Sequence, residues 1–311
     1  EPELPEDDDL TTSAPAKHAE HSAGRNSDLV DQIKEYADKM DRDGASRGDL
    51  KILARTMREL RYAFKVYSGY RDRRKVTVFG SARTPEDDPD FRQAVDFGRA
   101  MAEHDWMVIT GAANGIMEAG HRVHMKYFFT RKLMFVKECH AFVCLPGGFG
   151  TLDEALEVLT LLQTGKRDMV PLVLLNAPQG DYWTRFHEFV GEKLLKKGMI
   201  SPEDLSLYKV TNSCDEAVQE VLSFFRVYNS MRFVRDKLVF RLEEKLSPAM
   251  LADINDNFAD ILHSGEFVQT IALPEEDEPE LADLPRLVFR FNRRSLGRLR
   301  QLVDAINRGS V

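Results

Sequence analysis

The spacing of apolar residues changes twice along the chain and separates three regions. Between residues 28 and 72, apolar side chains recur at three- and four-residue steps, as in Leu29, Ile33, Tyr36 and Met40. This spacing puts them on one side of a helix. We therefore expect two amphipathic helices here, each with one buried stripe.

From residue 75 to about 226, short runs rich in β-branched residues alternate with helical patterns. The pattern predicts strands at 75–79, 106–110, 141–145, 170–175 and 207–210, and helices at 90–104, 115–121, 126–139, 151–164, 184–197 and 213–226. A continuous apolar run such as 141–145 is typical of a parallel strand covered on both faces. Alternating strands and helices predict an α/β fold with a Rossmann-like, doubly wound parallel sheet.

The pattern changes again after about residue 230. Strands are predicted at 237–242, 266–273 and 286–291, and helices at 246–261 and 295–307. This order predicts a small C-terminal α+β domain. The basic residues near the last helix are expected to face solvent or to pair with the acidic segment 275–280; they are Arg293, Arg294, Arg298 and Arg300.

Residues 1–27 are acidic and poor in apolar side chains, so they have little to bury and are expected to form a flexible tail. The predicted domain division is thus a tail at 1–27, a nucleotide-binding domain at 28–230 that includes the helices at 28–72, and a C-terminal domain at 231–311. We find no internal repeat.

Composition excludes several classes of partner and compartment. The formal net charge of −8 argues against nucleic-acid binding, which needs a basic face. No apolar run reaches the roughly 20 residues that span a bilayer, and the acidic N-terminal stretch does not resemble a secretory signal. Three cysteines without Cys-x-x-Cys spacing fit a reducing cytoplasm. We expect a cytoplasmic protein without membrane or nucleic-acid partners.

The sharpest chemical signal is the segment 146–154, Pro-Gly-Gly-Phe-Gly-Thr-Leu-Asp-Glu, between a buried strand and a helix. Its glycines let a ligand approach the main chain, and the helix start offers N–H groups with the positive end of the dipole. We expect these groups to hold a phosphate; the residues are Gly147, Gly148, Gly150 and Thr151. The alternative is a purely structural turn with Thr151 as the N-cap.

Two further small-residue loops follow predicted strands. Gly80 and Ser81 follow the first, and a loop with Gly111, Gly115 and Glu118 follows the second. Loops at the carboxyl ends of parallel strands converge where the strand order reverses. We expect these residues to complete a nucleotide cleft. No histidine or cysteine spacing in the chain predicts a metal site, and we expect no cofactor.

These motifs resemble the Lonely-guy family of phosphoribohydrolases, often mislabelled lysine decarboxylases. The family hallmark Pro-Gly-Gly-x-Gly-Thr-x-x-Glu matches 146–154, its Gly-Ile-Met-Glu-Ala matches 115–119, and its Arg-Lys pair matches Arg131 and Lys132. The resemblance covers about 75–226. It implies a Rossmann-like homodimer that hydrolyses the N-glycosidic bond of nucleoside 5′-monophosphates, such as AMP or cytokinin-riboside monophosphates.

The resemblance also implies roles for single residues. Glu154 would bind the ribose diol or position water, and a carboxylate there would stabilise the positive charge that develops on the sugar. Arg131 would bind phosphate or stabilise the departing base. The apolar helices 126–139 and 151–164 are the candidates for the dimer interface. A pyridoxal-phosphate lysine decarboxylase is disfavoured because no lysine has the context of a Schiff-base residue.

Two departures from the family keep another function open. Ala112 and Ala113 occupy positions that are usually glycine in the family, where their methyl groups would crowd a ligand. Only residues 120–125 separate two predicted helices, where the family has a further strand, so we interpret this stretch as one from which residues are missing. The alternative function is a nucleotide-sensing or molybdenum-cofactor carrier protein that uses the same cleft without turnover.

Overall fold

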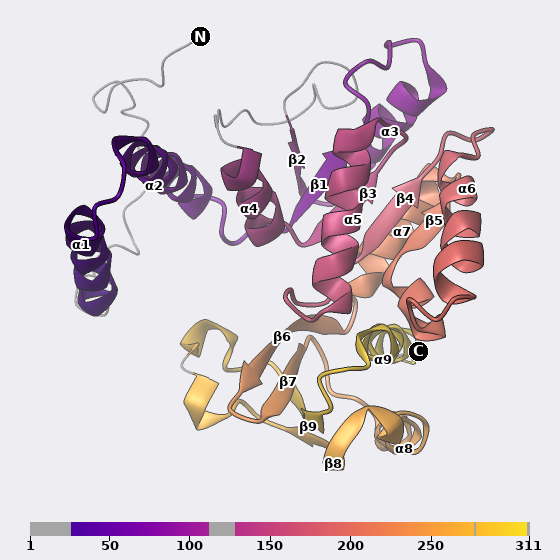
Figure 1. Cartoon of the computed structure of the whole chain (residues 1–311). Helices are drawn as coiled ribbons and strands as arrows, with labels where there is room; N and C mark the ends of the chain where they lie inside the picture. The colour runs from indigo at the N-terminus through magenta and orange to yellow at the C-terminus, as the bar shows by residue number, and fades with distance from the viewer. Residues whose placement is uncertain (1–25, 112–127, 277, 310–311) are drawn as a thin grey trace. The chain divides into compact units, whose positions relative to one another are not determined.

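The computed structural model describes residues 26–111, 128–276 and 278–309 (Figure 1). These residues belong to two compact units. The helical unit holds the described residues up to 72 together with 128–138, and the sheet unit holds the others. The expected tail (residues 1–25), the expected helix 115–121 and the short connection at 120–125 lie outside the described residues.

The helical unit contains α1 (Ser27–Arg42), α2 (Arg47–Ser68) and α4 (Phe128–Glu138). A capping box starts α2, because the Ser46 side chain accepts from the Asp49 N–H and the Asp49 carboxylate accepts from the Ser46 N–H. Helices α2 and α4 pack together, and the buried Thr130 hydroxyl donates to Glu59 at 2.8 Å. The expected helices are present.

The expectation of a buried apolar stripe on each N-terminal helix is wrong. No residue of α1 is buried. On α2 the face turned to α4 carries the buried Glu59, Ala63 and Tyr67, whereas Met57 and Phe64 on a neighbouring face are exposed. Helical spacing shows which side chains share a face, but it does not show whether anything covers that face.

The sheet unit begins with a five-stranded parallel sheet in the order β2-β1-β3-β4-β5. Its strands are β1 (Lys75–Phe79), β2 (Met107–Thr110), β3 (Ala141–Cys144), β4 (Leu172–Leu175) and β5 (Lys209–Thr211). Every residue of β1, β3 and β4 is buried, as expected for strands covered on both faces. The predicted α/β class and parallel sheet are therefore confirmed.

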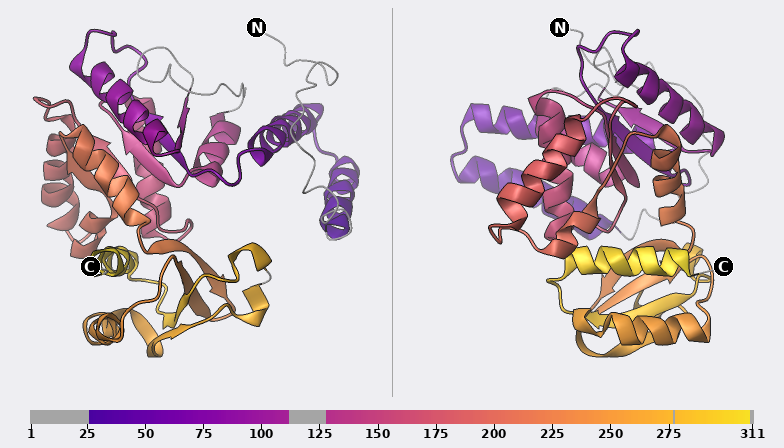
Figure 2. Two further views of the ribbon diagram at one scale, coloured as in Figure 1. Left: turned by 180° about the vertical axis from the view of Figure 1, so that it is seen from behind. Right: turned by 90° about the vertical axis from the view of Figure 1, so that its right-hand side faces the viewer.

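Helices cover both faces of this sheet (Figures 1 and 2). One face packs against α3 (Pro89–Glu103) and α7 (Cys214–Phe224), with Val78, Val143, Phe97 and Val221 in a common core. On the other face lie α5 (Phe149–Gln163) and α6 (Tyr182–Phe189), the latter continuing as a π-helix over Val190–Leu195. The double-sided cover makes the sheet doubly wound.

The C-terminal part is an antiparallel sheet in the order β6-β7-β9-β8. Its elements are β6 (Tyr228–Val234), β7 (Lys237–Leu242), α8 (Pro248–Asn257), β8 (Leu262–Thr270), β9 (Arg286–Phe291) and α9 (Leu296–Arg308). The strand β6 is absent from the sequence prediction, because its polar residues Asn229, Ser230 and Arg232 hide the alternation. Tyr228, Met231 and Val234 of β6 are nevertheless buried.

One face of this second sheet holds a row of aromatic rings. The ring centroids of Tyr228 and Phe240 are 5.1 Å apart, those of Phe240 and Phe289 5.3 Å, and those of Phe289 and Phe267 4.6 Å. Edge-on and tilted rings at these spacings attract each other beyond the area that they bury.

Arginines on the opposite face bind the acidic segment. Arg241 and Arg286 are buried and both bond to Glu276, whose carboxylate lies 2.8 Å from the Arg286 Nε and 3.1 Å from the Arg241 Nε. Arg232 donates to Glu278 at 2.8 Å. The expectation that the basic positions near the last helix face solvent or pair with this segment is wrong for two of them: Arg298 bonds to Asp260, and Arg300 to Asp304 and Glu220.

Helix α9 contacts both the first sheet's connecting segments and the start of the second sheet. Gly297 of α9 lies so close to the 3₁₀ helix Pro202–Leu207 that an added Cβ would come within 2.3 Å of the Glu203 carbonyl oxygen. Asn307 accepts from the N–H groups of Val227 and Tyr228 and donates to the Phe224 carbonyl. These bonds fix the segment that leads from α7 into β6.

Candidate functional site

The turns after β1 and β3 meet at the point where the strand order reverses. The Leu145 N–H donates to the Phe79 carbonyl at 2.8 Å, and the Ser81 N–H donates to the Pro146 carbonyl at 3.1 Å. In open α/β sheets, ligands bind at the carboxyl ends of the strands beside such a reversal. The glycine-rich turn therefore lies where this fold forms its ligand sites.

Helix α5 begins two residues earlier than the sequence predicts. Gly148 is the N-cap, α5 starts at Phe149, and Thr151 is buried in the first turn instead of capping it. Among the described residues, no acceptor faces the N–H groups of Phe149 and Gly150. Free N–H groups at the positive end of a fifteen-residue helix attract an anion.

Gly147 is required by its close packing. A Cβ at this position would lie 2.2 Å from the Thr151 Oγ1 and 3.0 Å from the Ser81 nitrogen. The Gly147 carbonyl accepts a 2.7 Å hydrogen bond from the Tyr182 hydroxyl, which comes from the start of α6. Sequence reasoning missed Tyr182; its place after a predicted strand, in Asp-Tyr-Trp, was the available signal.

Replacement of Gly147 tests this packing. Gly147→Ala is expected to lower the melting temperature by several degrees, because the new methyl group must displace Thr151 or the main chain at Ser81. Gly150→Ala is the matched control, since among the described residues no atom beyond its chain neighbours and its own helix backbone lies within 4 Å of the added Cβ, and alanine favours helix. Equal melting temperatures for Gly147→Ala and wild type in differential scanning calorimetry would contradict the packing argument.

Glu154 lies one turn into α5 and is buried, with 7% of its surface exposed. Cys144, the last residue of β3, is fully buried. Burial, and second the charge of Glu154, raise the pKa of the Cys144 thiol far above its ordinary range, so Cys144 stays protonated. The Glu154 side chain is therefore near the carboxyl end of the central strand β3.

The other expected site residues fall into three groups: some lie at the carboxyl edge of the sheet, some lie on α4, and some lie outside the described residues. Gly80 is buried and Ser81 half-buried at the end of β1, and Gly111 follows β2, whose Thr110 pairs with Val78. These residues share the carboxyl edge of the sheet with the 146–151 turn. Arg131 and Lys132 lie on α4 in the helical unit, and Gly115 and Glu118 lie outside the described residues, as do Ala112 and Ala113.

The neighbouring loops at this edge are held rigid by side chains. The buried Asn176 after β4 accepts from the Trp183 N–H at 2.8 Å, and its carbonyl accepts from Gln93 at 3.1 Å. Asp90 accepts from the Ala177 N–H at 2.9 Å, and burial raises the pKa of its carboxyl group. A rigid frame of this kind holds the turn and Tyr182 in place before a ligand arrives.

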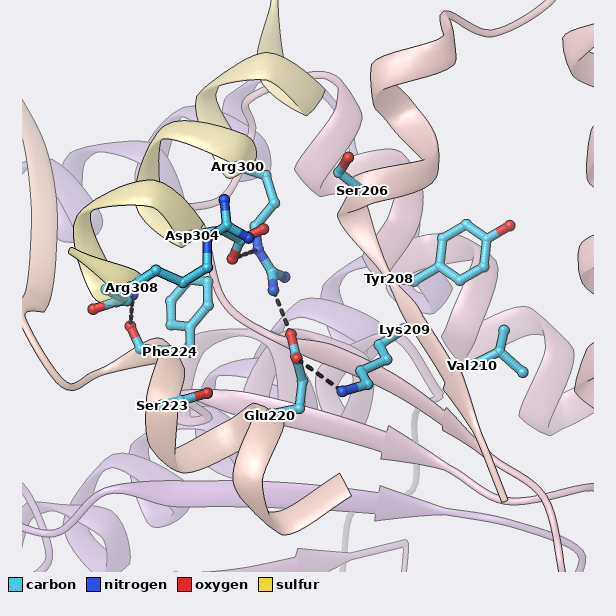
Figure 3. A pocket seen from close by; sticks show the side chains of 11 residues that line it. Ser206, Tyr208, Lys209, Val210, Glu220, Ser223, Phe224, Arg300, Asp304 and Arg308 are labelled. Carbon is cyan, nitrogen blue, oxygen red and sulfur yellow. Dashed lines mark hydrogen bonds and ion pairs between the residues drawn. The ribbon is translucent and has the colours of Figure 1, made fainter. Parts of the chain in front are cut away.

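A separate pocket of about 530 Å³ opens at the amino ends of the strands, between β5, α7 and α9 (Figure 3). Four of its five charged side chains form ion pairs with one another: Arg300 bonds to Glu220 and to Asp304, and Lys209 lies 3.6 Å from Glu220. Burial raises the pKa of the Asp304 carboxyl. The pocket is therefore a polar seam between the two sheets, away from the 146–151 turn.

Within the described ranges, no group of three histidine, cysteine or acidic side chains is arranged to hold a metal ion. No helix in this part of the chain is long and apolar enough to cross a membrane. The free cysteines are Cys139, Cys144 and Cys214. At the turn, the described residues include main-chain donors, hydroxyl groups and the buried Glu154 carboxylate.

Comparison with known proteins gives consistent matches for this region. Residues 102–221 match the family described as "Possible lysine decarboxylase", and residues 73–127 match the SLOG cluster4 family. Cytokinin riboside 5′-monophosphate phosphoribohydrolase LOG1 of Arabidopsis thaliana is 35% identical over 113 residues, 36% of this chain and 49% of that protein. The enzyme LOG4 of the same plant is 30% identical over 135 residues, 43% of this chain and 57% of that protein.

The chain spans about half the length of the curated relatives that it matches. Among solved structures, the molybdenum cofactor binding protein from the phototrophic bacterium Rippkaea orientalis aligns with a TM-score of 0.36 and 16% identity, over 49% of this chain and 96% of that chain. A likeness of this size carries no conclusion about function.

Proposed function

Since this chain belongs to the Lonely-guy family, through its residues 102–221, we propose that it hydrolyses the N-glycosidic bond of a nucleoside 5′-monophosphate. One observation carries the proposal: the free N–H groups at the start of α5 and the buried Glu154 are little more than one helical turn apart, at the reversal of the strand order. The first group suits a phosphate, and the second suits a sugar that becomes positively charged.

The phosphate would bind to the N–H groups of Phe149 and Gly150, with Gly147, Gly148 and Thr151 shaping the turn. Gly80 and Ser81 would border the ligand on one side, because the Ser81 main chain bonds to Pro146. Main-chain donors recognise a phosphate without regard to the base. The preference for a base would therefore be set elsewhere in the cleft.

In the reaction, the bond between C1′ and the base nitrogen breaks while a water oxygen bonds to C1′. The base leaves with a proton, and ribose 5-phosphate remains. The Glu154 carboxylate would bind the ribose hydroxyls or position the water, and would stabilise the positive charge on the ring. Arg131 would bind phosphate or stabilise the departing base, with Lys132 beside it in sequence.

A decarboxylase function, which the name of the matching family suggests, has no support at this site. Pyridoxal-phosphate enzymes bind their cofactor through a lysine Schiff base. Neither 146–154 nor 80–83 contains a lysine. The groups present here suit binding of a phosphorylated sugar and need no cofactor.

The quaternary structure and the compartment also belong to the proposal. We expect a homodimer that uses α4 or α5, because Phe129 and Leu133 on α4 and Phe149 and Leu156 on α5 are exposed. Phe149 has 92% of its surface exposed, at the first position of α5. Three cysteines without disulfides fit the proposed cytoplasmic location.

Incubation with single nucleotides tests the activity. We expect release of free base from AMP or from cytokinin-riboside monophosphates, and no release from the corresponding nucleosides, which lack the phosphate. Chromatography of the products over a panel of bases measures both. Tight nucleotide binding by calorimetry without release of base would favour the alternative, a nucleotide-sensing protein. Absence of both binding and release would reject either function.

A further inference from the structure

The N-terminal helices expose a row of large apolar side chains on each of α1 and α2, and of these the Phe64 ring lies under the Lys137 ammonium of α4. On α1, Leu29, Ile33 and Tyr36 share one face at helical spacing, with 54%, 48% and 57% of their surfaces exposed. On α2, Leu53, Met57 and Phe64 likewise share one face and are exposed. An amphipathic helix gains most of its stability in a protein by burying such a face.

Exposed apolar side chains are concentrated in the helical unit. Ten of the eighteen large exposed hydrophobic side chains in the described residues lie on its three helices. The remaining eight are spread singly or in pairs over α3, α5, α6, β6, β8 and nearby loops. Concentrated apolar patches mark interaction sites. Within this protein, the surface with the most exposed apolar side chains to cover these stripes is the helical unit of a second copy of the chain.

The charges of the two helices are complementary. Helix α1 has five acidic and three basic residues, and α2 has six basic and two acidic residues, so their formal charges are −2 and +4. Asp28 and Glu35 border the α1 stripe, and Arg58 and Lys65 border the α2 stripe, and the members of each pair are seven positions apart. Seven residues are two turns, about 10.5 Å along either helix.

We propose that α1 of one copy of this chain packs on α2 of a second copy, and α2 of the first on α1 of the second. The interface is two-fold and isologous, because the same two stripes meet twice. The Leu29, Ile33 and Tyr36 stripe covers the Leu53, Met57 and Phe64 stripe, and the acidic border of α1 faces the basic border of α2. At 1.5 Å per residue, the helices are about 24 and 33 Å long, so the α1 stripe fits within α2.

This interface is separate from the homodimer proposed for α4 or α5 and independent of the activity. The residues that carry it lie on α1 and α2, and none belongs to the candidate site. Variants that lose catalytic activity therefore do not test this interface. Variants of the α1 and α2 stripes are assessed by the mass of the assembly and not by turnover.

The first test replaces the α1 stripe in the full chain. The double variant Leu29→Glu and Ile33→Glu is expected to halve the mass of the assembly, measured by light scattering at micromolar concentration. Lys34→Glu changes the net charge by the same two units on the polar side of α1 and is expected to keep the wild-type mass. Circular dichroism checks that helix content is retained. An unchanged mass in the double variant overturns the proposal.

A charge exchange distinguishes a second copy from other occupants and does not depend on the folding of one variant. Arg58→Glu with Lys65→Glu is expected to weaken assembly at least about tenfold, and so is Asp28→Lys with Glu35→Lys. Mixing the two double variants brings opposite charges together at both α1–α2 contacts, so they should associate with each other more strongly than with themselves. If mixing gives no mixed assembly, the stripes do not bind a second copy and the proposal is wrong.

Discussion

Glu154→Gln is expected to reduce turnover of the nucleotide substrate about 100-fold or more without unfolding the chain. Glutamine keeps the size of the buried side chain and so opens no cavity, but it removes the negative charge beside the sugar. A 100-fold loss corresponds to about 2.7 kcal/mol of transition-state stabilisation. The measurement is kcat with saturating nucleotide, together with the melting temperature of the variant.

Asp153→Asn is the matched control, since this neighbour on α5 is exposed and lies outside the proposed site. It is expected to keep near-wild-type kcat, whereas Arg131→Ala is expected to lose most of its turnover while remaining folded. Near-normal rates in both Glu154→Gln and Arg131→Ala would reject the assignment of the site. A loss of folding in Glu154→Gln would instead identify Glu154 as structural.

Glu276→Ala is expected to destabilise the C-terminal sheet by about 3 kcal/mol or more. The carboxylate is 3% exposed and accepts from Arg286, from Arg241 and from the Leu273 N–H. Its removal leaves two buried guanidinium groups without this counter-charge. Removing one partner of a buried ion pair is strongly destabilising because the remaining charge stays buried and uncompensated. Chemical denaturation monitored by circular dichroism measures the difference.

Glu275→Ala is the control for this variant. Glu275 has the same side chain one position earlier, but its partner Arg235 is exposed, so the change is expected to cost less than about 1 kcal/mol. The pH dependence gives a second readout. Burial raises the pKa of Glu276, but bonds from Arg286, Leu273 and Arg241 outweigh this and hold the pKa below its ordinary value. The stabilisation is therefore complete above the ordinary pKa of a glutamate and is lost as the pH falls through the lowered pKa. Similar losses in both alanine variants would contradict the assigned role.

The parallel sheet was predictable because its strands are short, continuous apolar runs bounded by glycine or charge. The order of those strands was not, since it depends on which crossovers pack on which face. Strand β6 escaped because Asn229, Ser230 and Arg232 interrupt its alternation, and its burial comes from packing in the second sheet. The partners of the acidic segment were missed because Arg241 and Arg286 look like ordinary strand residues in the sequence.

The glycine-rich turn and its position after a buried strand were foreseen from 146–154. The contact between Ser81 and Pro146 was not, because it joins loops 65 residues apart and exists only once β1 and β3 are neighbours. Tyr182 was missed for the same reason. Arg131 was identified only by family resemblance, since an arginine on a helix has no local signal that distinguishes a ligand group from a surface charge.

The hydrogen bonds of Asn307 have a consequence for the order in which the protein matures during synthesis. Two backbone N–H groups at 227–228 and the carbonyl of Phe224 depend on this one side chain. Helix α9 follows every described strand along the chain, so it leaves the ribosome after them. Until then, the junction between the two sheets keeps open donors and an uncovered groove, so a nascent chain stalled before residue 307 would present a protease-sensitive joint at 224–228. The final turn of α9 thus supplies the hydrogen bonds of the segment that joins the two sheets.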